Sequence, residues 1–304
     1  MSVDDDAPRS AGVGAMALQP APGEASRGVR ARVPQRLWRN LTPDRTVVVV
    51  LGLFVFVVHD VGYVLGQPFW NDEAWVAVTT RFPLSQLPAT TSSTPIGWSV
   101  LVRVFTLGGD QTSRLLPLAF AGGAVAVAYW FARRLDWPNH TAAVTAGLLA
   151  ALGVLLTPAM LVRNDLKQYT TDAFFALLTL ALTSRLERVW SRRGLAALSL
   201  AVWGGMLFSH TVAFVGAAAL GAVCLVQLAR RAWRQLAEAT VTAAITGALM
   251  LAVYASFDAR AVNPGLTAYW HHYYLPVHNG VHVGIRFVTA RFTAVHSYFG
   301  LGPA

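Results

Sequence analysis

Two adjacent carboxylates occur in the segment Asn71-Asp72-Glu73-Ala74-Trp75, directly after the first long apolar run of the chain. Carboxylates in this setting can accept protons or bind cations. The preceding run is long enough to place both side chains at the edge of a bilayer. The segment therefore predicts acidic chemistry at a membrane surface. The alternative is that Asp72 and Glu73 simply begin a surface helix, where acidic residues favour the helix dipole.

Three further groups of polar residues occur between or after apolar runs. They are Arg163, Asp165 and Lys167 followed by Tyr169 and Asp172, then His210, and finally His271, His272 and His278. Each group has an ordinary structural explanation as well. A short charge run is typical of a solvated loop, and a single histidine can hydrate a turn. The last histidines lack metal-binding spacing, and their aromatic neighbours are typical of a membrane-interface belt.

The composition indicates that membrane helices position these residues. Hydrophobic residues make up 55% of the 304, charged residues only 13%, and the mean hydropathy is +0.47. The net charge of +9 could suggest nucleic-acid binding. However, all but one of the 24 basic residues are Arg, and many lie in short loops between apolar runs, which is typical of a topology signal. The sequence thus predicts an all-α polytopic membrane protein.

Seven apolar runs are predicted to cross the membrane and to form a core over residues 46–257. They cover residues 46–66, 113–133, 140–161, 171–187, 195–209, 211–229 and 239–257. Arg-rich segments lie before the first run and after the second, fourth and sixth, so the positive-inside rule makes those segments cytoplasmic. Residues 67–112, 162–170 and 258–304 are then expected on the outer face. The predicted location is the plasma membrane, with a cytoplasmic N-terminus.

Two stretches test this topology. Residues 95–107 are apolar but span about 20 Å as a helix, so we expect a helix along the outer membrane surface. A cysteine at Ser99 should then react with reagents from outside. The block 195–228 would reach about 50 Å as one helix, so Ser209-His210-Thr211 is predicted to be an outer turn.

The remaining segments are less informative. Residues 1–45 are rich in Ala, Gly, Pro, Ser and Arg, which predicts a disordered basic tail. The single cysteine, Cys224, lies in an apolar run and predicts an inert core residue. Asp60 lies in the outer half of the first predicted crossing, where a charge usually faces a cavity or a partner. Residues 258–304 form the predicted outer aromatic and histidine segment.

The order of these features resembles the GT-C glycosyltransferases. The similarity is greatest to the family-39-like branch, with the protein O-mannosyltransferases and lipid A aminoarabinose transferases, and covers about residues 46–280. The features that carry it are the Asp72-Glu73 pair, Thr94-Pro95-Ile96-Gly97-Trp98, Tyr169-Thr170-Thr171-Asp172, and Tyr269 to Tyr274 with His278. The resemblance implies a GT-C-like bundle with juxtamembrane helices in the first outer loop.

The resemblance also implies a function. Such enzymes move a sugar from a polyprenyl phosphate to an acceptor hydroxyl on the outer face, with inversion at the anomeric carbon. Asp72 would be the catalytic base, and Glu73 would support it or bind a divalent cation. Arg163, Lys167 and His210 would bind the donor phosphate. Tyr169, Asp172, His271 and His278 would support the site, and the acceptor is a glycan, protein or lipid of the cell envelope.

The chain departs from the family pattern in two places. Ser93-Thr94 replaces the Glu-Lys that aminoarabinose transferases carry before the proline, which removes a metal ligand and a phosphate-binding lysine. The chain also ends at Ala304 where relatives continue, so a truncated chain or a reduced acceptor side is expected. Two alternatives remain: a transporter or lipid flippase, and a noncatalytic lipid-binding relative. Against transport, the ionisable groups gather on one face and no inverted repeat is visible.

Overall fold

The computed structural model describes residues 43–91, 94–157, 166–262, 264–270, 276 and 280–298, and these contain helices and no strand. The predicted tail 1–45 lies almost wholly outside the described residues. The α-helices are α1 (Pro43–Val58), α2 (Val61–Gly66), α3 (Asn71–Thr79), α4 (Leu87–Thr90), α5 (Ile96–Phe105), α6 (Leu115–Arg133), α7 (His140–Leu155), α9 (Tyr169–Arg188), α10 (Arg192–Met206), α11 (Thr211–Ala229), α12 (Trp233–Ser256), α13 (Pro264–Trp270) and α14 (Val281–Tyr298). Short 3₁₀ turns are η2 (Thr106–Gly108), η3 (Asp110–Arg114) and η4 (Asp258–Arg260).

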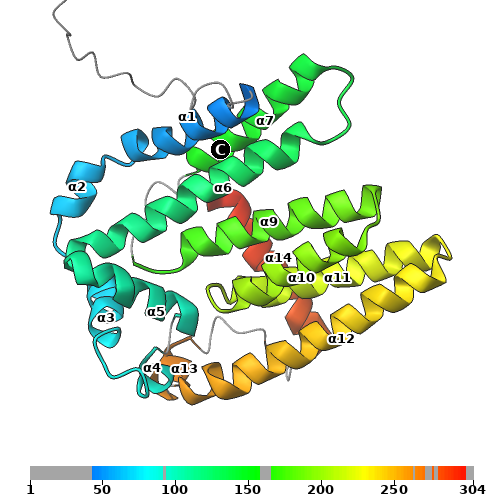
Figure 1. Cartoon of the computed structure of the whole chain (residues 1–304). Helices are drawn as coiled ribbons and strands as arrows, with labels where there is room; N and C mark the ends of the chain where they lie inside the picture. The colour runs from blue at the N-terminus through cyan, green and yellow to red at the C-terminus, as the bar shows by residue number, and fades with distance from the viewer. Residues whose placement is uncertain are drawn as a thin grey trace, which may run out of the picture. The chain divides into compact units, whose positions relative to one another are not determined.

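Successive long helices from α6 to α12 run in alternate directions (Figure 1). The first residues of α6, α9 and α11 therefore lie at one end of the bundle, together with α3, α4 and α5 (Figure 1). We call this the Asp72 end. The opposite end, which we call the arginine end, holds Arg133, Arg188, Arg192 and Arg230, the last of which donates to the carbonyl of Glu187. The predicted grouping of arginines thus occurs in three dimensions.

Three described segments are long and apolar enough to cross a membrane, namely Asp110–Arg133, Thr211–Ala229 and Trp233–Arg260. This finding agrees with an all-helical membrane protein. The predicted crossings 140–161 and 195–209 contain the shorter helices α7 and α10, each about 23 Å long. The predicted crossing 171–187 corresponds to α9, which is longer but carries Asp172, Arg185 and Arg188. The number of seven crossings, and their orientation, remain predictions.

The first predicted crossing is not one helix. α1 ends at Val58, and Asp60 adopts a left-handed conformation (φ 42°) before α2 starts at Val61. The Asp60 carboxylate accepts a hydrogen bond from the backbone N–H of Tyr63 at 3.2 Å, which caps α2. Asp60 thus has a local role as the cap of α2. This role differs from the expectation that its side chain faces a cavity or a partner. Asp favours both a helix N-cap and the left-handed region, so it breaks the apolar run here.

Three apolar clusters hold the described helices together. Leu118, Val125 and Tyr129 of α6 pack with residues of α1 and α7. A second cluster joins α9, α10, α11 and α12. A third cluster, which includes Val76 and Trp98, attaches α3 and α5 to the start of α6. This third cluster holds the short helices in place at the Asp72 end.

A helix, α5, occurs where the sequence predicts one over residues 95–107, and its buried side contacts the bundle closely. Its place along an outer membrane surface stays a prediction. The backbone N–H of Trp98 donates to the carbonyl of Leu207 at 3.2 Å, and a Cβ at Gly97 would lie 2.5 Å from the same oxygen. Only glycine allows this approach. Ser99 is fully buried and lies 2.9 Å from the hydroxyl of Thr94, so the expected labelling of a cysteine at this position is wrong. The amphipathic sequence predicted a helix but not how deeply it is buried.

Candidate functional site

Glu73 forms a buried ion pair with Arg114, a residue that sequence reasoning missed. Arg114 Nη2 lies 2.5 Å from one carboxylate oxygen of Glu73, and Nε lies 3.1 Å from the other. Each side chain is only 5% exposed. The first carboxylate oxygen also accepts the backbone N–H of Trp70 at 2.9 Å, which caps α3. Donors therefore contact both oxygens of Glu73, which favours a supporting role over cation binding.

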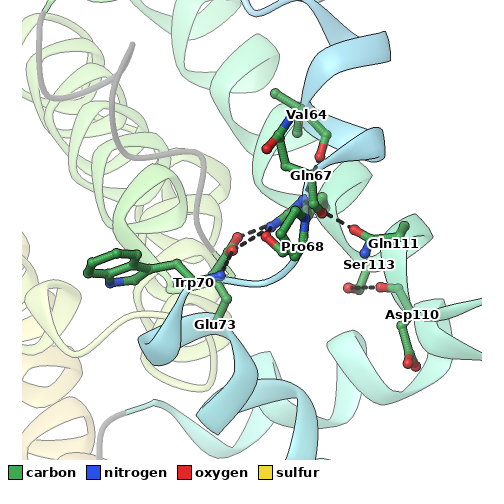
Figure 2. A network of polar contacts seen from close by, with 9 residues as sticks. Val64, Gln67, Pro68, Trp70, Glu73, Asp110, Gln111 and Ser113 are labelled. Atoms are coloured by element: carbon green, nitrogen blue, oxygen red, sulfur yellow. Dashed lines mark hydrogen bonds and ion pairs between the residues drawn. The ribbon is translucent and has the colours of Figure 1, made fainter.

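The rest of the Arg114 guanidinium binds the segment between α2 and α3. Nη1 donates to the carbonyls of Val64 at 2.6 Å and Gln67 at 2.7 Å, and Nη2 donates to the carbonyl of Pro68 at 2.9 Å. Figure 2 shows Glu73, Gln67, Pro68 and Gln111 converging on this position. A buried charge is tolerated when it is paired and its donors are satisfied. One arginine thus connects the segment between α2 and α3 to the start of α6.

This anchoring leaves Asp72 on the accessible side of α3. The Asp72 side chain is 53% exposed, and its carboxylate lies 2.7 Å from Nζ of Lys167, which is 17% exposed. The two residues are 95 positions apart and come from the two predicted outer loops. The structure therefore brings together the predicted base and one of the three predicted phosphate ligands.

A cluster of packed aromatic residues contacts the segment that contains Lys167. The indole N–H of Trp98 donates to the carbonyl of Leu166 at 2.7 Å, next to Lys167. Trp98 packs against Phe120, which contacts both Phe174 and Phe175 with ring centroids 5.6 and 6.3 Å away. This cluster links α5, α6 and α9. Apolar packing from three helices therefore helps to set where Lys167 lies.

A cavity of about 400 Å³ lies on the same face of α3 as Asp72. Trp75 and Thr79 line it and follow Asp72 by three and seven residues, a spacing that shares one helix face. Phe82 and Thr90 contribute from the segment after α3, and Val262 from the segment after η4. The walls are therefore aromatic and apolar with hydroxyl groups.

A second polar cluster occurs where α9, α10 and α11 meet at the Asp72 end. The hydroxyl of Ser209 donates to Asp172 at 2.5 Å. His210 Nε2 lies 3.4 Å from a carboxylate oxygen of Asp258. His210 thus has two carboxyl groups near it, Asp172 and Asp258, and its predicted role in phosphate binding stays a prediction. The predicted outer turn 209–211 matches the break between α10 and α11.

Two other arginines, which lie between α3 and α6, have structural partners. Arg81 forms an exposed ion pair with Asp110 at 2.5 Å. Arg103 donates to the carbonyls of Thr80 at 3.3 Å and Phe82 at 2.5 Å. Both contacts connect the end of α3 with the α5 to η3 region. Neither side chain contacts Asp72 directly.

Several predicted site residues cannot be placed. Arg163, His271 and His278 lie outside the described residues, as do Asp165 and His272. Tyr169 is the first residue of α9 and is partly exposed. The roles predicted for these residues remain predictions.

Arg114 had a sequence signal that was overlooked. A single arginine at the start of an apolar run is costly unless a partner satisfies it. The predicted loop before it offers three acids, Asp72, Glu73 and Asp110, and the 41-residue separation hides which of them is the partner. The signal that could have found this ion pair is therefore an arginine at the start of an apolar run together with an acidic residue in the loop before it.

The described residues contain no group of three or more His, Cys, Asp or Glu that could hold a metal ion. Comparison of the chain with protein-family models, with curated proteins and with solved structures yields no match. The geometry at the Asp72 end is therefore the basis for assigning a function.

Proposed function

We propose that this protein is a membrane glycosyltransferase that moves a sugar from a polyprenyl-phosphate donor to an acceptor hydroxyl at the outer membrane face. The observation that carries the proposal is the Asp72 and Lys167 pair, 2.7 Å apart, at one end of an apolar helical bundle. A cavity at the same end is lined by Trp75 and Thr79, which share a helix face with Asp72. A half-exposed carboxylate beside a single cation suits a reaction that takes up a proton and releases an anion.

The reaction is a single displacement at the anomeric carbon. Asp72 accepts the proton of the acceptor hydroxyl while that oxygen forms a bond to the anomeric carbon. The bond from this carbon to the phosphate oxygen breaks, and the polyprenyl phosphate leaves with the electron pair. Lys167 stabilises the negative charge that grows on the phosphate, and attack from the opposite face inverts the configuration.

The cavity on the Asp72 face of α3 supports binding of a sugar. Trp75 and Phe82 offer aromatic surfaces for the apolar face of a sugar ring, and Thr79 and Thr90 offer hydroxyl groups. A volume of about 400 Å³ suits a small ligand and is open to its surroundings at this end. The lipid tail of the donor would remain in the bilayer.

The buried Glu73 and Arg114 pair has a positioning role in this proposal. It fixes the first turn of α3, and Asp72 is the neighbouring residue in that turn. A catalytic carboxylate needs a fixed position relative to the reacting atoms. Glu73 would therefore act through Asp72 rather than on the substrate.

The decisive experiment is a transfer assay on Asp72→Asn. Membranes that contain the full chain are incubated with radiolabelled undecaprenyl-phosphate mannose, glucose or aminoarabinose, and label is followed into lipid, glycan and protein fractions. We expect the wild type to transfer at least one sugar. Asp72→Asn should lower that rate at least about 100-fold, because an amide cannot accept the proton.

Asp110→Asn is the matched control, because Asp110 is another half-exposed acid at the same end, also paired with a basic residue. This variant should keep near-normal transfer. Failure of the wild type to transfer any of these sugars would overturn the proposed function. Normal transfer by Asp72→Asn would refute the assignment of the base.

A further inference from the structure

The arginine end of the bundle contains a larger cavity than the Asp72 end. It has a volume of about 520 Å³ and lies between the last turns of α6 and α9. Arg133, Arg134, Arg185 and Arg188 line it, and none of the described lining residues is acidic. α6 is 19 residues long, about 28 Å, so the cavity is one helix length from Arg114 and the site above.

The charges around this cavity are only partly balanced. Arg133 pairs with Asp44 at 2.8 Å, and Arg188 pairs with Asp136 at 3.3 Å. Four arginines against two carboxylates leave an excess of two positive charges. The guanidinium of Arg185 has no hydrogen bond or ion pair with any described residue, and Arg134 lies over the ring of Trp130 without an acidic partner among the described residues.

Arg133 contributes less to this excess than Arg134 and Arg185, because both of its terminal nitrogens are engaged, one by Asp44 and the other by His140. The geometry of arginine fits phosphate oxygens well.

The walls of the cavity are amphiphilic. Trp130 and Phe131 of α6 and Val189 after α9 add apolar surface beside the guanidinium groups. Tryptophan at the end of an apolar helix is typical of the membrane interface, where lipid headgroups lie. Basic pockets between membrane helices can bind acidic headgroups. A soluble anion would use the arginines but not the apolar walls.

We propose that this cavity binds the phosphate headgroup of an anionic phospholipid from the leaflet at the arginine end. Arg134 and Arg185 supply the charge that carboxylates do not neutralise. The acyl chains extend along the apolar surface between α6 and α9. Bound lipid would join the last turns of these two helices.

The test compares two double variants that remove the same charge. Arg134→Gln with Arg185→Gln changes the cavity, whereas Arg193→Gln with Arg231→Gln changes exposed arginines of the same end that do not line it. Each protein is purified as the full chain, and binding of phosphatidylglycerol and phosphatidylcholine is measured by native mass spectrometry. We expect preferential binding of phosphatidylglycerol to the wild type and a loss of roughly 10- to 30-fold in the cavity variant only.

The other outcomes overturn the proposal. An equal loss in both double variants would show general surface attraction without a site. Full displacement of phosphatidylglycerol by glycerol phosphate at similar concentration would show a site for soluble anions. The single variant Arg185→Gln breaks no side-chain hydrogen bond or ion pair with the described residues, and the side chain is exposed, so the variant should fold. Unchanged phosphatidylglycerol binding in Arg185→Gln would also refute the assignment, whatever the double variant does.

Discussion

Asp72 and Glu73 are neighbours in sequence, yet their surroundings give them different tasks. Glu73 is buried against Arg114, and Asp72 is half-exposed beside Lys167. Adjacent residues of a helix point about 100° apart, so one can face the bundle while the other faces solvent. The pair is thus one anchor and one accessible carboxylate rather than two equivalent acids.

Glu73→Gln should destabilise the protein strongly. The change leaves Arg114 buried without its counter-ion, and loss of one partner of a buried pair costs about 3–5 kcal/mol. Three backbone carbonyls still accept from Arg114, so we expect about 3 kcal/mol. Thermal unfolding of the purified protein measures this effect as a lower midpoint.

Arg81→Gln is the control for this prediction, because Arg81 and Asp110 form an exposed pair in the same region. Exposed pairs contribute about 0–1 kcal/mol, so its midpoint should change little. Equal midpoints for Glu73→Gln and Arg81→Gln would show that the buried pair does not stabilise the loop.

Among the elements, α5 is held by contacts with two distant parts of the chain. Its first turn touches the carbonyl of Leu207 through Gly97 and Trp98, and Trp98 also reaches the carbonyl of Leu166. This short helix therefore contacts the end of α10 and the segment before α9 at once. Movement of α5 would shift Lys167 relative to Asp72.

Gly97→Ala should destabilise the protein by about 1–3 kcal/mol, because the new Cβ meets backbone atoms of Leu207 that have to move. Gly153→Ala is the matched control in α7, where nothing lies within 4 Å of the added atom. This control should be neutral or stabilising by up to about 1 kcal/mol. Both are measured by thermal unfolding, and equal effects would contradict the close approach.

For the whole molecule, the arrangement of charges separates two ends. Asp72, Lys167 and Asp172 lie at one end, and the arginine-lined cavity lies at the other. Apolar helices connect the two ends, and three of the described segments are long enough to span a bilayer. The positive-inside rule then predicts that the Asp72 end faces outward.

Cysteine labelling tests this orientation in a Cys224→Ala background. Ser85 is exposed in the segment between α3 and α4, and Ser191 is exposed before α10 at the arginine end. Ser85→Cys should react with a membrane-impermeant thiol reagent in intact cells, and Ser191→Cys only after permeabilisation. The reverse pattern would invert the topology, and labelling of both in intact cells would refute a membrane-separated arrangement.

The sequence by itself determined the helical class, the turn at residues 209–211 and the grouping of arginines at one end, because apolar periodicity and short basic loops are local signals. It predicted the helix around residues 95–107 but not the burial of Ser99, since burial depends on residues far along the chain. It also missed the break at Asp60, where a local cap interrupts an apolar run. Only the tertiary structure decided that Glu73 pairs with Arg114 and Asp72 with Lys167, because these contacts join residues 41 and 95 positions apart.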